Sequence, residues 1–489
     1  MIQTNNTKQA AWVAIGSLCS FGFTIVSSMI LSRYFNKADY GTYKQVMYVY
    51  NTLLTIFTLG LPKAFSYFLP RVELTQSKSL IRKITNLFFL LGSIFSILLF
   101  FFSSQIASFL YNPELAKALR VFAIVPFLML PTMGLEGILA TFKQTKFLAA
   151  YNILTNVFKL LCVALPVMLW NLSYIEALLG FVIASVFTFC MALFLKYYPV
   201  RNQGNEDCQV SYREIFKFAV PLLTASLWGF IIASTDQFFI SRYFGSAVFA
   251  EFSNGWLSLP FLGMITGATA TVLSPVFSRM SYQQVDPKKE IYPLWMSVFE
   301  KSAKLIYPLL IYCIFFADVV MSVMYGQQYW CSGSYFRIKL VTDFFAIIIY
   351  APLLINIGKV KFYSNVHLFI ALLVVCLEYI SVKTIQTPFA ISWISTSCQL
   401  IKSFALLWLV AKYFNVKIYK LFPLKVLIQI LLPSFIILLV ERLVLVDLMN
   451  INNVLVLFVS FFVYIILYFG YSVVAKMDYF GIVKPLIKK

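Results

Sequence analysis

Long apolar runs separated by short polar connections make up most of the chain. Two of the clearest are FFLLGSIFSILLFFF (residues 88–102) and VLVLFVSFFVYIILYFG (residues 454–470). About 20 apolar residues in a helix cross the roughly 30 Å of hydrocarbon in a bilayer. Such runs predict about fourteen membrane-spanning helices, near residues 10–34, 40–69, 83–108, 118–140, 146–169, 173–197, 214–240, 247–277, 302–324, 335–357, 362–383, 388–411, 424–446 and 453–475.

The polar connections between these runs are short. The longest, residues 198–213 and 279–301, leave no room for a soluble domain. Of the 489 residues, 61% are hydrophobic and 12% are charged, whereas a soluble protein carries about 25% charged residues. We therefore expect an all-α integral membrane protein.

Basic residues are distributed unequally between the two sides of the predicted membrane protein. With the N-terminus inside, the inner connections and the tail hold roughly 26 of the 39 Lys and Arg residues. Examples are Arg71, Lys196, Lys288 and Lys489. This positive-inside bias predicts that both termini face the cytoplasm. It also accounts for most of the net charge of +20, so no nucleic-acid partner is expected.

Several chemistries have no support in the sequence. The eight cysteines show no CxxC spacing, and His367 is the only histidine, so we expect no metal site and no cofactor. No GxxxxGK[ST] phosphate-binding loop is present. An integral-membrane polymerase or ligase would carry catalytic residues on a sizeable outer loop, and the outer loops here are short. The chain is expected to be a transporter or channel rather than an enzyme.

The phrase ILSRYFNKADYGTY (residues 30–43) has a counterpart in FISRYFGSAVFAEF (residues 239–252). An apolar run follows each copy and closes on Pro70-Arg71 or Ser278-Arg279. Six predicted spans separate the copies, so both have the same orientation in the membrane. This pattern predicts two parallel six-helix lobes related by a pseudo-two-fold axis, as in alternating-access transporters.

The repeat also suggests domain boundaries. We expect an N-terminal six-helix lobe in residues 1–200 and a C-terminal six-helix lobe in residues 201–415. Residues 416–489 would add two transmembrane helices and a cytoplasmic tail outside the duplication.

Three phrases carry a family resemblance: LSRYFNKADYGTY (31–43), GLPKAFSYFLPR (60–71) and VMYGQQYWCSGSYFRI (323–338). With the duplicated lobes, they resemble the multidrug/oligosaccharidyl-lipid/polysaccharide exporter superfamily, and within it the flippases of O-antigen and capsule repeat units. The resemblance implies a central cavity lined largely by spans 1, 2, 7 and 8. It implies a substrate with an undecaprenyl tail, a pyrophosphate and an oligosaccharide, moved across a bacterial cytoplasmic membrane. A polysaccharide polymerase and chain-length machinery would be partners.

Two lysines lie deep inside predicted spans. Lys159 is near the middle of span 5 and Lys402 is similarly deep in span 12. A charge at such a depth costs about 3 kcal/mol or more, so it usually faces a wet cavity or a partner. Two interpretations stay open: that these lysines hold the pyrophosphate or an acidic sugar, or that they pair between helices or snorkel along their stems.

Span 2 contributes three further basic candidates. Lys44 lies one turn from its outer end, where snorkelling is the simpler explanation. Lys63 follows Gly60 and Pro62, which should break the helix and turn the lysine toward the cavity. Arg71 is either an anchor at the inner interface or a first contact for an arriving diphosphate.

The repeated arginines and one acid complete the candidate site. Arg33 and Arg242 occupy the outer rim in the two copies, either as interface anchors or as contacts of an outer gate. Asp236, about four residues from the outer end of span 7, is either a proton or sodium site or the partner of Arg242 or Lys44.

The function expected from these features is translocation of a lipid-linked oligosaccharide repeat unit for surface polysaccharide biosynthesis. A peptidoglycan-precursor flippase is the nearest alternative. A cation-coupled multidrug antiporter fits less well, because span 1 has no acidic residue and the deepest charges are lysines.

Overall fold

A computed structural model describes residues 2–204, 206–449, 451–477 and 479. Its described residues form helices and turns and no strands, so the all-α prediction is confirmed. The chain divides into two compact units, Met1–Glu251 and Phe252–Lys489. This division follows contacts, whereas the lobe boundaries at residues 200 and 415 follow the repeat and stay predictions.

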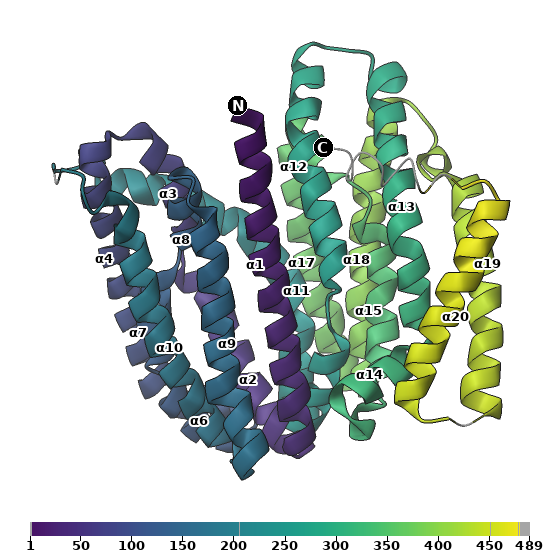
Figure 1. Cartoon of the computed structure of the whole chain (residues 1–489), viewed down its shortest axis with the longest axis horizontal. Helices are drawn as coiled ribbons and strands as arrows, with labels where there is room; N and C mark the ends of the chain where they lie inside the picture. The colour runs from purple at the N-terminus through teal and green to yellow at the C-terminus, as the bar shows by residue number, and fades with distance from the viewer. Residues whose placement is uncertain (1, 205, 450, 478, 480–489) are drawn as a thin grey trace. The chain divides into compact units, whose positions relative to one another are not determined.

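The first unit contains α1 to α10 and most of α11 (Figure 1). Their bounds are α1 Ile2–Tyr34, α2 Lys37–Phe57, α3 Pro62–Phe68, α4 Leu74–Phe101, α5 Ser103–Phe109, α6 Glu114–Phe122, α7 Val125–Met129, α8 Leu135–Thr141, α9 Thr145–Trp170, α10 Tyr174–Tyr197 and α11 Tyr212–Gly255. Long neighbours approach closely where one of them carries glycine, as is common in membranes. A Cβ on Gly180 of α10 would overlap the carbonyl of Cys162 on α9, and α1 packs along the other side of α9.

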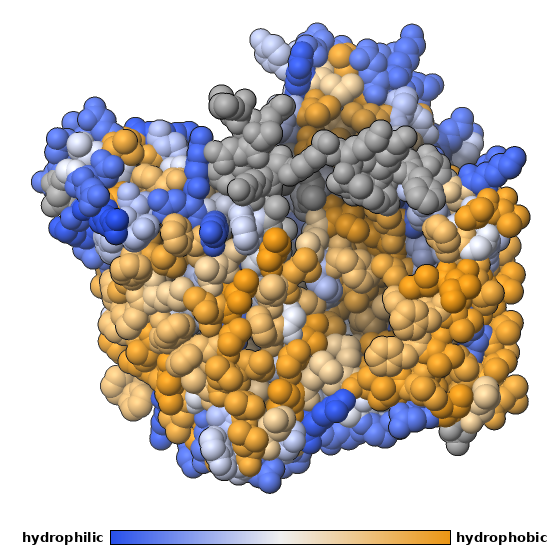
Figure 2. All heavy atoms as spheres, in the orientation of Figure 1, coloured by the Kyte–Doolittle hydropathy of each residue, from blue (hydrophilic) through white to orange (hydrophobic). Residues whose placement is uncertain are grey.

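The second unit contains the end of α11 and the remaining helices. Their bounds are α12 Pro260–Tyr282, α13 Tyr292–Phe315, α14 Ala317–Tyr325, α15 Ser332–Ala346, α16 Ala351–Asn356, α17 Val360–Thr384, α18 Pro388–Phe414, α19 Leu424–Arg442 and α20 Asn453–Val474. In both units, hydrophobic residues cover the middle of the helices and hydrophilic residues gather at their ends (Figure 2). This distribution is the one that a bilayer requires.

Among the described residues, eleven helices or helix groups are long and apolar enough to span a membrane, and the bent pair α13 and α14 would make a twelfth. The predicted count of fourteen is not confirmed. The span predicted at 214–240 falls partly on side chains outside the described residues. The span predicted at 335–357 is divided between α15 and α16, each too short to qualify alone.

One predicted span is interrupted in its course. α11 is kinked at Gly245, where φ is 82°, next to the predicted start of the run at 247–277; its last segment ends at Gly255, and α12 begins only at Pro260. Gly255 lies so close to Ser332 that a Cβ there would overlap the Ser332 carbonyl. Proline at the first helical position needs no N–H partner, which makes Pro260 a favourable start.

Polar contacts link the last helix, α20, to α13 and α19 within the second unit. Tyr312 of α13 hydrogen bonds to the Leu457 carbonyl and to Ser460 of α20, both at 3.0 Å. The Tyr464 hydroxyl of α20 lies within hydrogen-bond distance of the Ser434 hydroxyl of α19, at 2.9 Å, and of the Pro308 carbonyl, at 3.1 Å.

A buried acid adds a stronger link to α19. Asp318 of α14 is 4% exposed and contacts two guanidinium groups, Arg337 of α15 at 2.8 Å and Arg442 of α19 at 2.6 Å. Arg442 also donates to the Phe315 carbonyl. The sequence pattern did not single out these three residues as a cluster.

We expect Arg442→Met to lower the free energy of unfolding by about 1–3 kcal/mol, because Asp318 and the Phe315 carbonyl each lose a charged donor. Thermal unfolding of the purified protein measures this. Lys425→Met, at the exposed opposite end of α19, is the control and should change little. Equal stability of both variants would show that the Arg442 ion pair contributes nothing.

Candidate functional site

The predicted break around Lys63 is present. α2 ends at Phe57, and Leu59 and Gly60 take positive φ angles of 49° and 72° before α3 begins at Pro62. Lys63 lies on this short second segment and is exposed. Because the helix breaks immediately before it, the lysine is presented by an irregular stretch of backbone rather than by a continuous span.

Arg71 ends the 3₁₀ turn that follows α3. Its guanidinium carbon lies 3.4 Å from the ring centroid of Tyr67, and that ring stacks on Phe218 of α11 at 4.1 Å. Arg71 is exposed, yet cation–π contact fixes its position.

Lys44 is half-buried and points toward α1. Its Nζ lies 3.4 Å from the Ser28 hydroxyl and 5.1 Å from the Tyr40 ring centroid. Among the described residues, no carboxylate lies within ion-pair distance of it.

Lys159 is half-buried between α9 and α10. Its Nζ lies 3.8 Å from the ring centroid of Phe181, a distance at which an aromatic face attracts a cation. The described part of the chain supplies no carboxylate within 4 Å of it. The Lys159 ammonium group therefore contacts an aromatic ring rather than a carboxylate, so it can still bind an anion.

Lys402 is half-buried on α18 in the second unit and lies near Lys339 of α15, whose charge acts on it. Lys339 is paired with Asp343 at 2.8 Å and also donates to Thr342 at 3.1 Å. Lys339 thus has an acidic partner, whereas Lys402 has no carboxylate within ion-pair distance among the described residues. The locality keeps an excess positive charge inside the apolar part of the unit.

Asp236 of α11 is fully buried, and its Oδ1 accepts the backbone N–H of Gln237 at 2.8 Å. Neither an ion-coupling role nor a pairing role for Asp236 is tested by this geometry, so both stay predictions.

The two copies of the sequence repeat contact each other inside the first unit, at a place that we call the α2–α11 junction. It consists of Lys37, Gly41, Thr42 and Gln45 of α2, Asn112 before α6, and Ser241, Ser246 and Glu251 of α11. Gln45 donates to Ser241 at 2.9 Å. Asn112 donates to Gln45 at 2.6 Å and to Thr42 at 2.9 Å. Lys37 forms an ion pair with Glu251.

Arg33 and Arg242, which are equivalent in the repeat, have different surroundings. Arg33 is exposed near the end of α1. Arg242 is half-buried and donates to the Phe109 carbonyl at the end of α5 and to the Tyr111 hydroxyl at 3.5 Å. Its guanidinium also lies 4.4 Å from the Phe109 ring centroid and 4.7 Å from that of Tyr111.

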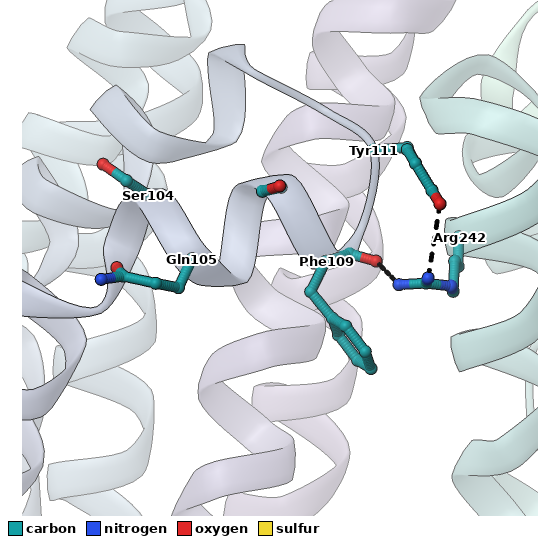
Figure 3. Close-up of a pocket in the computed structure, with 6 residues that line it drawn as sticks. Ser104, Gln105, Phe109, Tyr111 and Arg242 are labelled. Atoms are coloured by element: carbon teal, nitrogen blue, oxygen red, sulfur yellow. Dashed lines mark hydrogen bonds between the residues drawn. The ribbon is translucent and has the colours of Figure 1, made fainter.

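A pocket of about 600 Å³ opens beside Arg242, and we call it the α5 pocket. It is lined by Ser104, Gln105, Ser108, Phe109, Tyr111 and Arg242. Figure 3 shows Ser104 and Gln105 along α5, with Phe109, Tyr111 and Arg242 gathered at its end. A second pocket of about 420 Å³ shares Ser104, Ser108 and Tyr111 with the first and extends past Asn112 toward α6.

The position of Lys196 differs from the one that we predicted from the sequence. Lys196, near the end of α10, was counted among the inner connections, but it is fully buried. Its Nζ lies 4.7 Å from the Phe65 ring centroid and 5.5 Å from that of Phe88, with no hydrogen-bond partner in the described structure. Its position at the end of an apolar run gave no signal of this burial, which depends on α3 and α4.

The α2–α11 junction depends on close contact at Gly41. A Cβ there would overlap the backbone carbonyl of Ser246. We expect Gly41→Ala to lower the free energy of unfolding by about 1–3 kcal/mol, as overpacking does. Gly22→Ala on α1, where a Cβ meets nothing within 4 Å, is the matched control. Thermal unfolding of both purified variants tests this, and equal stability would contradict a tight junction.

Comparisons with solved structures identify proteins of similar fold. The chain resembles a solved lipid II flippase, MurJ in an inward closed conformation, with a TM-score of 0.71 and 16% identity over 95% of this chain and 98% of that one. A transporter of the MOP superfamily from Pyrococcus furiosus has a TM-score of 0.57 and 15% identity over 84% of this chain and 95% of that one. An inward-facing multidrug transporter of the same superfamily has a TM-score of 0.60 and 13% identity over 83% of this chain and 99% of that one. At these identities the likeness shows the fold alone.

No match was found among curated proteins. A family model described as "polysaccharide biosynthesis protein" matches residues 30–332, which is more than half of the chain. This match confirms the predicted resemblance to the polysaccharide branch. The chain belongs to the polysaccharide biosynthesis protein family, within a fold shared by lipid flippases and multidrug transporters.

Proposed function

We propose that this protein moves a polyprenyl-pyrophosphate-linked oligosaccharide from the inner to the outer leaflet of a bacterial cytoplasmic membrane, for surface polysaccharide biosynthesis. The observation that carries the proposal is the family match over residues 30–332. The fold, which is similar to that of a lipid II flippase, supports it.

The substrate sets the physical problem. Its lipid tail stays in the bilayer, but its pyrophosphate carries negative charge across roughly 30 Å of hydrocarbon. An uncompensated charge there costs several kcal/mol. The protein must therefore offer cations inside the apolar region that are not already neutralised by its own acids.

Lys159 and Lys402 meet this requirement. Both are half-buried within membrane-spanning helices, and neither has a carboxylate within ion-pair distance among the described residues. Lys339, which lies beside Lys402, is neutralised by its ion pair with Asp343. A diphosphate that contacts these ammonium groups would gain charge-assisted hydrogen bonds in place of its water shell.

The broken helix suggests where the substrate is first met. Lys63 and Arg71 are both exposed and lie within the short segment after α2. The positive-inside bias places this segment at the cytoplasmic side. We propose that these two residues attract the diphosphate from the inner leaflet before it reaches the deeper lysines.

The α2–α11 junction fits a gate that opens and closes. Its contacts are hydrogen bonds between neutral side chains and one partly exposed ion pair, Lys37–Glu251. Such contacts contribute only about 1 kcal/mol each. A junction of this kind holds the predicted outer ends together and separates at a modest cost, which alternating access needs.

A peptidoglycan-precursor flippase remains the second candidate, because the lipid II flippase shares the fold over nearly the whole chain. The family match favours polysaccharide substrates instead. We propose transport without covalent chemistry, with delivery of the repeat unit to a polymerase and chain-length machinery at the outer face.

The function is tested by measuring undecaprenyl-linked glycans by leaflet in a deletion strain. We expect complete repeat units to accumulate on the cytoplasmic side, and the wild-type gene to relieve this. Lys159→Ala and Lys402→Ala should each reduce relief at least about tenfold, the effect of losing ~1.4 kcal/mol of anion stabilisation. Lys289→Ala, whose side chain is 83% exposed, is the control and should behave as wild type.

Two results would count against these assignments. Normal delivery of complete units to the outer leaflet in the deletion strain, with no second flippase gene present, would refute the function. Full relief by both lysine variants would keep the function and remove Lys159 and Lys402 from the site.

The orientation has its own test. Cys331, between α14 and α15, is exposed and lies on the predicted outer side. In a variant whose other cysteines are replaced by serine, we expect a membrane-impermeant maleimide to label Cys331 in intact spheroplasts. Tyr282→Cys in the same background provides the inner control, since Tyr282 is 90% exposed at the end of α12. Labelling of Tyr282→Cys alone would reverse the topology.

A further inference from the structure

We propose that the α5 pocket binds the saccharide part of the substrate at the outer face, and that it prefers a saccharide bearing an acidic group. This inference rests on the proposed function and adds to it a release-side site and a substrate class. The α5–α6 connection joins spans 3 and 4, which the basic-residue distribution places on the outer side.

The pocket offers the groups that saccharides need. Sugar rings present apolar faces that pack on aromatic side chains and hydroxyls that exchange hydrogen bonds. Phe109 and Tyr111 are 56% and 69% exposed, so their rings are open to a ligand. Ser104, Gln105 and Ser108 add two hydroxyls and an amide, each able to donate and to accept.

The charge of the pocket favours an acid. Arg242 lines it, and the lining residues of this pocket and of its neighbour include no carboxylate. A guanidinium has five N–H donors, and its contacts with the Phe109 carbonyl and the Tyr111 hydroxyl use only part of them. Arg120 lies close by, with hydrogen bonds to Ser103 at 3.1 Å and to Ser104 at 2.8 Å.

The backbone at Tyr111 supports a role beyond packing. Tyr111 has a φ angle of 51°, a left-handed conformation that favours glycine or asparagine and is unfavourable for a large aromatic residue. It lies two residues after the end of α5, where the Asn112 N–H donates to the Ala107 carbonyl at 3.0 Å. A tyrosine at this position therefore has a conformational cost. Burial of its ring does not offset this cost, because the ring is exposed.

The size of the site suits more than one sugar. The two pockets, of about 600 and 420 Å³, meet at Ser104, Ser108 and Tyr111. Ligand sites of drug-like size occupy about 300–1,000 Å³. Tyr111 therefore stands between two adjoining hollows, in a position to contact consecutive rings of one oligosaccharide.

Binding to the purified full-length protein in nanodiscs, which avoids sugar-based detergents, tests the inference. The probes are a hexuronic-acid disaccharide, lactose and inorganic phosphate, measured by calorimetry. We expect the acidic disaccharide to bind at least about tenfold more tightly than lactose or phosphate. Tyr111→Asn should weaken this binding about tenfold while folding normally, because asparagine suits a positive φ.

Two further variants locate the effect. Arg242→Gln should abolish the preference for the acidic disaccharide over lactose. Phe101→Ala removes an aromatic ring that is also 69% exposed but lies outside both pockets, and should bind as wild type. Equal affinity of wild type and Tyr111→Asn, equal binding of phosphate and the acidic disaccharide, or no binding of any probe would each overturn the inference.

The result is separable from that of the proposed function. Leaflet delivery in cells reports flipping, whereas the nanodisc experiment reports only the outer pocket. A protein that restores delivery but binds no saccharide at Tyr111 would retain the function and lose the pocket. A protein that binds the disaccharide but does not restore delivery would contradict the function on which this inference rests, and the pocket would no longer be a release site.

Discussion

The cost of holding charge in hydrocarbon is the constraint on which the rest of this structure depends. An ammonium or carboxylate inside a bilayer must find an opposite charge, a polarisable ring or a wet surface. Acids are scarce in this chain, with 19 Asp and Glu against 39 Lys and Arg. Most cations inside the helices consequently have to be accommodated without an acid of their own.

The structure uses different solutions in different places. Asp343 and Lys339 neutralise each other, and Asp318 is surrounded by two guanidinium groups. Lys159 rests on Phe181, and Lys196 lies near Phe65 and Phe88. Aromatic residues make up 18% of the chain, so their faces are available where carboxylates are not. An aromatic ring attracts a cation more weakly than a carboxylate does. An incoming anion therefore replaces the ring as the partner of that cation more easily than it would replace a carboxylate.

Much of the fold followed from the sequence, because its signals are local. Apolar runs of span length predicted most of the helices, and Gly60 with Pro62 predicted the break before Lys63. The family was recognised from short phrases, and the match over residues 30–332 confirms it. The interruption between α11 and α12 was not predicted, and Gly255 beside it lies in close contact with another helix, which a local pattern does not show. The division of the span at 335–357 was not predicted either.

The candidate site was less predictable for the same reason. The pattern identified Arg242 but not the pocket beside it, since Phe109 and Tyr111 reach it from a distant part of the chain. Lys196 was counted with the basic residues of the inner connections, because its burial depends on side chains from α3 and α4. The repeat was visible in the sequence, whereas the contact between its two copies at Gly41 and Ser246 was not.

The arrangement around Asp318 has a consequence for biogenesis. Arg337 lies 19 positions after the acid in the chain, whereas Arg442 lies 124 positions after it. Asp318 and Arg337 are therefore both present in the chain before Arg442 is synthesised, and pairing with each other would lower the cost of placing either charge in the bilayer. Arg442 of α19 supplies the second donor to the same acid only after that.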